Sequence, residues 1–168
     1  AYNNMGETQK SIDFLKQELS QFPNNKIYEK HLAELYISES PESAVSAYKK
    51  IIKHNNKDIV ALNNLAWVLL QTNQLTEALN YSEKAKALAP KHPQILDTHG
   101  IILIKQNKLN DAISSLSQAS ELSPNNSEIM LHLAQAYIAN NEKQKALDII
   151  SKLTPDDKQK WKQEIDAL

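Results

Sequence analysis

Apolar residues recur along the chain with the spacing of helices, and the helical segments come in pairs. In residues 59–92 a first segment carries Leu62, Leu65 and Leu69, and a second carries Leu75 and Leu79. Each set lies on one face of a helix, and the few residues between the sets allow only a short turn. The pattern therefore predicts two amphipathic helices that pack against each other as a hairpin.

The paired pattern repeats along the chain with a period of 34 residues. Alanines with this spacing are Ala44, Ala78, Ala112 and Ala146. A second series of small residues, at or within one residue of the same spacing, is Ala33, Ala66, Gly100 and Ala134. Small side chains are needed where two helices approach most closely, and Pro90 and Pro124 end units because proline cannot continue a helix. We infer copies of one helical hairpin.

The turn inside each unit carries an asparagine at the same period: Asn73, Asn107 and Asn141. The residue that follows a helix often adopts the left-handed conformation, which favours glycine first and asparagine next. We therefore predict a positive φ at all three asparagines.

These features resemble the tetratricopeptide repeat, with its small residue at position 8, its alanine at position 20 and its proline at position 32. The matching residues at position 8 are Ala66, Gly100 and Ala134, and those at position 20 are Ala78, Ala112 and Ala146. The resemblance implies an all-α, right-handed superhelical solenoid of antiparallel helix pairs with a C-terminal capping helix.

The alignment divides residues 1–168 into one array. Its expected parts are the second helix of a partial repeat (6–22), a degenerate repeat with a shorter turn (25–58), three repeats (59–92, 93–126 and 127–154) and a capping helix (155–168). For the cap, Thr154 is the expected N-cap, and Trp161, Ile165 and Leu168 form one apolar stripe. Because the array begins on a half repeat, we expect it to be the C-terminal piece of a longer array.

Composition removes several classes of function. The chain has two glycines and no cysteine, which disfavours phosphate-binding loops, disulfides and thiolate metal sites. The net charge of −1 gives no reason to expect a nucleic-acid partner, and the apolar runs are too short to span a membrane. The five histidines show no metal-binding spacing, and His99 is interpreted as a packing residue. We expect no enzyme activity, no cofactor and no metal.

The family resemblance implies that first helices line a concave groove that binds a protein or peptide ligand. The groove residues that it implies are Asn64, Trp67, Leu70, Thr98, Ile101, Ile104, Lys105, Leu131, His132, Gln135 and Ile138. Asp97 falls on the same groove register. The alternative is that the apolar members only seal neighbouring first helices together.

Three functional classes remain open. Residues 59–153 are similar to the last repeats of bacterial tetratricopeptide lipoproteins that accompany exosortase (PEP-CTERM) and exopolysaccharide systems, which favours the bacterial envelope. A repeat array that recruits substrate for an enzyme such as a glycosyltransferase is the second class. A cytosolic co-chaperone is the third, although only Asn64 matches the groove of that class. We expect a monomer, and the cytoplasm remains open as its location.

Overall fold

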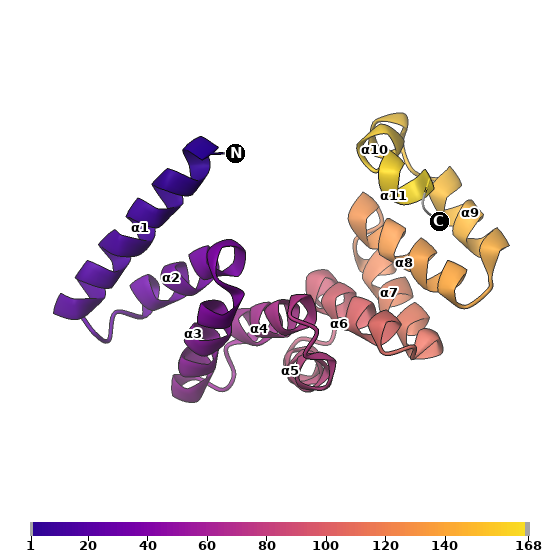
Figure 1. The fold of residues 1–168 in the computed structure, drawn as a ribbon. Helices are drawn as coiled ribbons and strands as arrows, with labels where there is room; N and C mark the ends of the chain where they lie inside the picture. Colours follow the sequence, from indigo (N-terminus) through magenta and orange to yellow (C-terminus); the bar gives the residue numbers. More distant parts are fainter. Residues whose placement is uncertain (1, 167–168) are drawn as a thin grey trace. The chain divides into compact units, whose positions relative to one another are not determined.

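The computed structural model describes residues 2–166, with side chains at 6–163 and 165–166, so Leu168 lies outside the described part. This part contains eleven helices and no strand (Figure 1). The all-helical architecture agrees with the prediction, and the helix beyond the expected ten arises because the capping segment forms two helices. The first six are α1 (Tyr2–Gln21), α2 (Lys26–Glu39), α3 (Pro41–His54), α4 (Ile59–Gln71), α5 (Leu75–Leu88) and α6 (Pro93–Lys105). The other five are α7 (Leu109–Leu122), α8 (Ser127–Ala139), α9 (Lys143–Ser151), α10 (Pro155–Lys160) and α11 (Lys162–Asp166).

The chain forms two compact units, of which unit 1 ends at Tyr81 and unit 2 begins at Ser82, within α5. In unit 1, α2 packs against α1 and α3, and α3 packs against α4. In unit 2, α7 packs against α6 and α8, α8 packs against α9, and the first helices α6 and α8 also touch each other (Figure 1). Within each unit, these helices therefore pack mainly against their neighbours in sequence, as repeat proteins do.

Small residues lie where the helices of a hairpin cross. The alanines Ala44, Ala78, Ala112 and Ala146 are all fully buried. At Gly100 in α6, an added Cβ would lie 2.4 Å from Cγ of Leu116 in α7. A side chain at this position would push α6 and α7 apart, which explains why the register requires a small residue.

The three turn asparagines adopt the predicted conformation. Asn73, Asn107 and Asn141 have φ values of 58°, 58° and 62°. In the turn after α6, the amide of Asn107 donates to the carbonyl of Ile104, and the amide of Lys108 donates to the carbonyl of Leu103. The other two turns repeat this pair of bonds, which is the Schellman motif. The prediction is confirmed, and the motif explains how the last carbonyls of these helices are satisfied.

The degenerate repeat turns differently. Ser40 is both the last cap of α2 and the first cap of α3, with φ −155° and ψ 84°, and Pro41 opens α3. No left-handed residue is needed, because the chain reverses at one extended residue. One residue joins α2 to α3, whereas three residues join the helices of each later hairpin, and α2 is one residue longer than α4. The spacing from Ala33 to Ala44 is therefore one residue shorter than in the other repeats.

The first helices begin on side-chain caps that recur with the repeat. Oδ1 of Asn25, Asp58 and Asn126 accepts hydrogen bonds from amides of the first turn of α2, α4 and α8. A side-chain cap was predicted only at Thr154, which precedes α10, and its Oγ1 accepts a hydrogen bond from the amide of Asp157, as expected. At His92 the side chain makes no cap bond, and α6 instead begins with Pro93.

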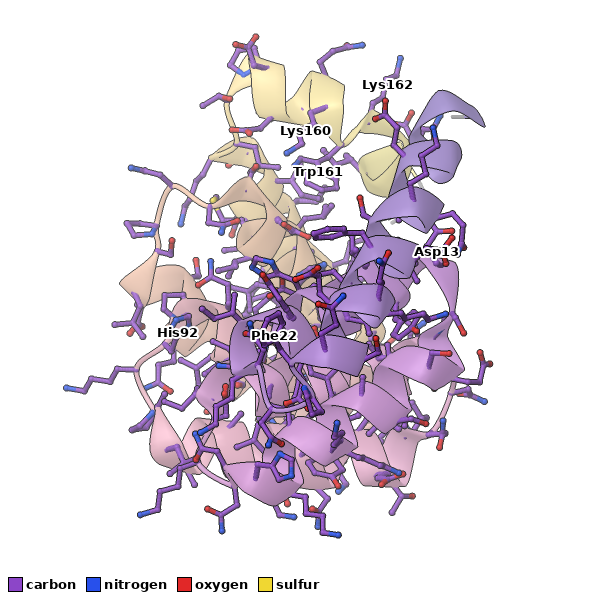
Figure 2. The ribbon with its side chains drawn as sticks, turned by 90° about the vertical axis from the view of Figure 1, so that its left-hand side faces the viewer. Asp13, Phe22, His92, Lys160, Trp161 and Lys162 are labelled. Atoms are coloured by element: carbon purple, nitrogen blue, oxygen red, sulfur yellow. The ribbon has the colours of Figure 1, made fainter. Side chains whose placement is uncertain are left out.

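The two ends of the chain differ in detail from expectation. α1 begins at Tyr2, earlier than the expected residue 6. The cap consists of two short helices, because the backbone at Trp161 leaves the helical conformation with φ −103° and ψ 22°. Nε1 of Trp161 donates to Oγ of Ser127 over 3.1 Å. Nζ of Lys160 lies 4.5 Å from the centroid of the Trp161 ring, and Figure 2 labels both residues. The indole thus ties the end of the chain to the start of α8.

Candidate protein-binding face

The polar centre of the candidate site in unit 2 is a hydrogen bond between a histidine and a carboxylate of its two first helices. Nδ1 of His132 in α8 lies 2.8 Å from Oδ1 of Asp97 in α6. The two side chains are 17% and 14% exposed, respectively. An ionised carboxylate can only accept hydrogen bonds, so Nδ1 carries the proton and Nε2 is the ring nitrogen left for other partners. The pair fixes both the neighbouring helices and the orientation of the imidazole.

Apolar side chains of the same two helices lie at the predicted groove positions. Ile101 and Ile104 in α6 and Ile138 in α8 are half-buried, as is Gln135, while Lys105 is exposed. Each isoleucine therefore gives part of its surface to packing and leaves part to solvent. We call these residues, with Asp97 and His132, the α6–α8 face.

Two predicted groove residues are not available on this face. Thr98 is 7% exposed and Leu131 is 2% exposed, so both belong to the packed interior. Leu131 stands in α8 at the register that Asp97 occupies in α6. An apolar side chain gains free energy from burial at this register, whereas Asp97 keeps partial contact with water. Neither Thr98 nor Leu131 therefore offers an open side chain to a ligand in this structure, unlike the expectation for a groove residue.

The remaining predicted residues lie on α4 in unit 1. Asn64, Trp67 and Leu70 are half-buried. Nδ2 of Asn64 donates to the hydroxyl of Tyr48 in α3 over 3.1 Å. Burial raises the pKa of Tyr48 to about 12, which keeps the phenol neutral. One function of Asn64 is thus to satisfy a buried tyrosine.

His99 is the histidine that the sequence analysis interpreted as structural. It is 5% exposed, and its Nδ1 lies 3.0 Å from Oγ of Ser82, which is fully buried. Burial, together with the charge of Lys86, lowers the pKa of His99 to about 4, so the ring is neutral at pH 7. Because both members are buried, this serine–histidine pair is closed to a substrate.

Among the described residues, no group of three or more His, Cys, Asp or Glu side chains is placed to hold a metal ion. Within the same residues, every helix is too short or too polar to cross a membrane.

Sequence reasoning missed one unusual residue, the buried Glu29 of α2. It stands at the register position of Leu62, Leu96 and Met130, so an alignment of the four first helices contains the signal. Pairing of Asp97 with His132 was also missed, because it depends on which side chains of successive first helices meet.

Comparison with protein families agrees with the repeat architecture. The sequence profile of the tetratricopeptide repeat matches residues 103–167. The profile described as anaphase-promoting complex, cyclosome, subunit 3 matches residues 27–119, which is more than half of the chain. The chain belongs to the tetratricopeptide-repeat family. No curated protein matches the sequence significantly.

Solved structures with the same fold cover most of the chain. MamA from Desulfovibrio magneticus RS-1, residues 41 to the end, has a TM-score of 0.80 and 19% identity, covering 89% of this chain and 85% of that one. PilF of Pseudomonas aeruginosa has a TM-score of 0.74 and 20% identity, with 90% and 71% covered. YrrB, described as a tetratricopeptide-repeat protein with an unusual peptide-binding site, has a TM-score of 0.71 and 18% identity, with 89% and 78% covered. At these identities the likeness establishes the fold.

Proposed function

We propose that the chain is a non-catalytic protein-interaction scaffold and that its α6–α8 face binds a peptide or helical segment. The observation that carries the proposal is the partly exposed pair of Asp97 and His132 beside the half-buried Ile101, Ile104 and Ile138. Family membership and the fold support the class, and YrrB is a protein of the same fold that has a peptide-binding site.

The geometry gives each group a distinct part in recognition. The isoleucines supply apolar contact for side chains of a ligand. Asp97 holds the imidazole of His132 in place, so Nε2 can bond a polar group of the ligand at little entropic cost. Lys105 and Gln135 add hydrogen-bond donors at other points of the face.

On α4, the register supports a further proposal. Asn64, Trp67 and Leu70 occupy positions in unit 1 that correspond to the face in unit 2, and we propose that they also contact a protein ligand.

The setting of the scaffold is a finer proposal, which the sequence resemblance of residues 59–153 supports. We propose a bacterial envelope protein connected with exosortase or exopolysaccharide systems, with an array attached to an enzyme such as a glycosyltransferase as the alternative. The gene sequence upstream of residue 1 tests this. A signal sequence with a lipid-modified cysteine would support the envelope protein, whereas a catalytic domain would support the array attached to an enzyme.

Binding is tested with a random peptide library displayed on phage and selected against the purified chain. We expect selected peptides to shift amide signals of α6 and α8 in a ¹⁵N–¹H NMR titration. Ile101→Ala combined with Ile104→Ala should weaken the binding of these peptides about tenfold or more, because apolar contacts at the centre of an interface dominate affinity.

Leu122→Ala combined with Leu147→Ala is the matched control. Leu122 in α7 and Leu147 in α9 are 42% and 46% exposed, so the control removes the same kind of side chain from second helices. Peptides that tolerate the isoleucine variant and fail to bind the control variant would place the interface on the second helices and contradict the proposal.

A further inference from the structure

Unit 1 contains a pocket of about 190 Å³ where the start of α2, the end of α3 and the residue before α4 meet. Its lining residues are Lys26, Ile27, Glu29, Lys30, Ile51, His54, Asn55 and Asp58. One water occupies about 30 Å³ in the liquid, so the pocket has room for a small organic group. None of these residues belongs to the α6–α8 face, so binding in this pocket is independent of the proposed function.

Glu29 is the residue that the repeat fold does not explain. The same register position holds Leu62, Leu96 and Met130 in the other first helices, and all three are buried. Glu29 is also buried, at 8% exposed. Burial of a carboxylate costs free energy unless other groups compensate its charge. An apolar residue would serve packing better, so Glu29 points to another role.

The compensation of Glu29 is incomplete. Nζ of Lys50 lies 2.7 Å from Oε1 of Glu29, but the lysine side chain is 58% exposed. The approach lies outside hydrogen-bond geometry, and no described residue donates a hydrogen bond to this buried oxygen. Glu29 therefore has one ion partner, a lysine whose side chain is mostly in solvent, and its Oε1 accepts no hydrogen bond of good geometry from a described residue.

Asp58, the other carboxylate of the pocket, is satisfied. Its Oδ2 lies 2.6 Å from Nζ of Lys30, and its Oδ1 accepts from the amide of Ala61. Burial of Asp58 is outweighed by these bonds, which lower the pKa of its carboxyl below the usual range. The charge of Lys30 is thus neutralised within the pocket, and Glu29 is the acceptor that remains for a ligand.

Apolar walls accompany this acceptor. Ile51 is buried and occupies the register of the smaller Ala85 and Ala119, and Ile27 is 64% exposed. We propose that the pocket binds an alkylammonium group, whose N–H donors bond Glu29 while its alkyl stem contacts Ile27 and Ile51. An ammonium supplies three donors, and its stem is apolar, so both halves of the group find a match. The bound ammonium displaces Lys50, which returns to solvent.

Such a group has two sources, a free aliphatic amine or the end of a lysine side chain in a partner protein. The probes are n-butylammonium chloride and a blocked Gly-Lys-Gly peptide, each titrated into the ¹⁵N-labelled chain. We expect amide shifts at residues 27–30 and 51–55. Tighter binding of the peptide assigns a lysine side chain, and tighter binding of butylammonium assigns a free amine. The neutral analogues, n-butanol and the Nε-acetylated peptide, should cause no shift.

Variants test the role of Glu29. Glu29→Gln keeps the shape and removes the charge, and should weaken binding at least tenfold, whereas Glu39→Gln, at an exposed acid of the same helix, should not. Lys50→Ala removes the competitor and should strengthen binding, which a merely structural ion pair would not do. The proposal is overturned if neither amine shifts the pocket amides, if Glu29→Gln binds as well as the wild type, or if Lys50→Ala weakens binding.

Discussion

At the scale of single residues, each turn asparagine combines two requirements of its position. Asn73, Asn107 and Asn141 adopt a conformation that costs other residues energy, and their amides bond back to the preceding helix. Asparagine tolerates this conformation because its short polar side chain can bond locally. The chain thus makes three Schellman turns without glycine.

Substitution of Asn107 measures the conformational requirement. Asn107→Gly should change the free energy of unfolding by no more than about 0.5 kcal/mol, because glycine adopts positive φ freely. Asn107→Val should lower it by about 1–2 kcal/mol, since a β-branched residue is strained at this φ. Urea unfolding measures both free-energy changes. Asn110→Val, at an exposed position of α7, is the control for the loss of an asparagine side chain. Equal stability of the glycine and valine variants would contradict the argument.

Gly100 is fixed by contact rather than by its backbone conformation. Gly100→Ala should lower the free energy of unfolding by about 1–3 kcal/mol, because the new Cβ would lie 2.4 Å from Cγ of the buried Leu116. Gly6 is the matched control: it is helical, and nothing lies within 4 Å of an added Cβ. Gly6→Ala should therefore stabilise by about 0.5–1 kcal/mol. Thermal or urea unfolding distinguishes the expected loss of stability in Gly100→Ala from the expected gain in Gly6→Ala.

His99 makes stability depend on pH. Its pKa falls from the ordinary 6.5 to about 4 on folding, so the unfolded chain binds the proton first. This contribution is complete above about pH 6.5 and is lost as the pH falls toward 4, by roughly 1.4 kcal/mol per unit at most. The free energy of unfolding should differ less between pH 7 and pH 5 in the His99→Gln variant than in the wild type. His92→Gln, at an exposed histidine, should leave the difference unchanged.

The residues that could be predicted from sequence are those whose role is local to one hairpin. A period of 34 was enough to identify the small crossing residues and the left-handed turns, because both depend only on position within the unit. The pair of Asp97 and His132 could not be predicted this way. It joins successive first helices, and its formation depends on side-chain reach across a helix contact.

At the scale of helices, the chain ends show where local patterns are insufficient. Threonine, proline and acids predicted the start of α10 correctly, since a helix start depends on a few consecutive residues. The break at Trp161 was not predicted. The indole of Trp161 donates a hydrogen bond to Ser127 of α8, which is distant in sequence. The backbone leaves the helical conformation at the same residue, and the sequence pattern of residues 155–168 does not indicate this break.

Removal of the capping segment tests its contribution. Deletion of residues 155–168 should lower the melting temperature and promote aggregation, because half-buried Trp161 and Ile165 and buried Leu153 pack at this end. Trp161→Ala should cost about 1–2 kcal/mol, less than a fully buried tryptophan. Trp161→Phe, which removes the bond to Ser127 and keeps the ring, should cost about 0.5–1.5 kcal/mol. Lys162→Ala is the exposed control, and a truncated chain as stable as the full one would contradict the role.

At the scale of the whole molecule, the repeat fixes the fold class and leaves recognition to individual positions. One register position holds the buried Leu131 in α8 and the partly exposed Asp97, which is hydrogen-bonded to His132, in α6. Another register position holds Leu62 in the core and Glu29 beside a pocket. A family alignment predicts where a groove residue stands in the sequence. Burial of each side chain decides whether it reaches a ligand, and this depends on the neighbours that the hairpins bring together.

We predict that the chain is monomeric in solution. Among the described residues, the large apolar side chains that are more than a third exposed occur one to a helix, as with Phe14 on α1, Val60 on α4 and Leu122 on α7, apart from Phe22 in the turn after α1. Scattered apolar residues are normal on a monomer, whereas stable self-association needs a continuous patch. Sedimentation equilibrium at pH 8, above the isoelectric point of about 6.6, should return the chain mass of 19.0 kDa at all concentrations. A dimer that Phe14→Ser abolishes and Leu122→Ser leaves intact would contradict this and assign self-association to α1.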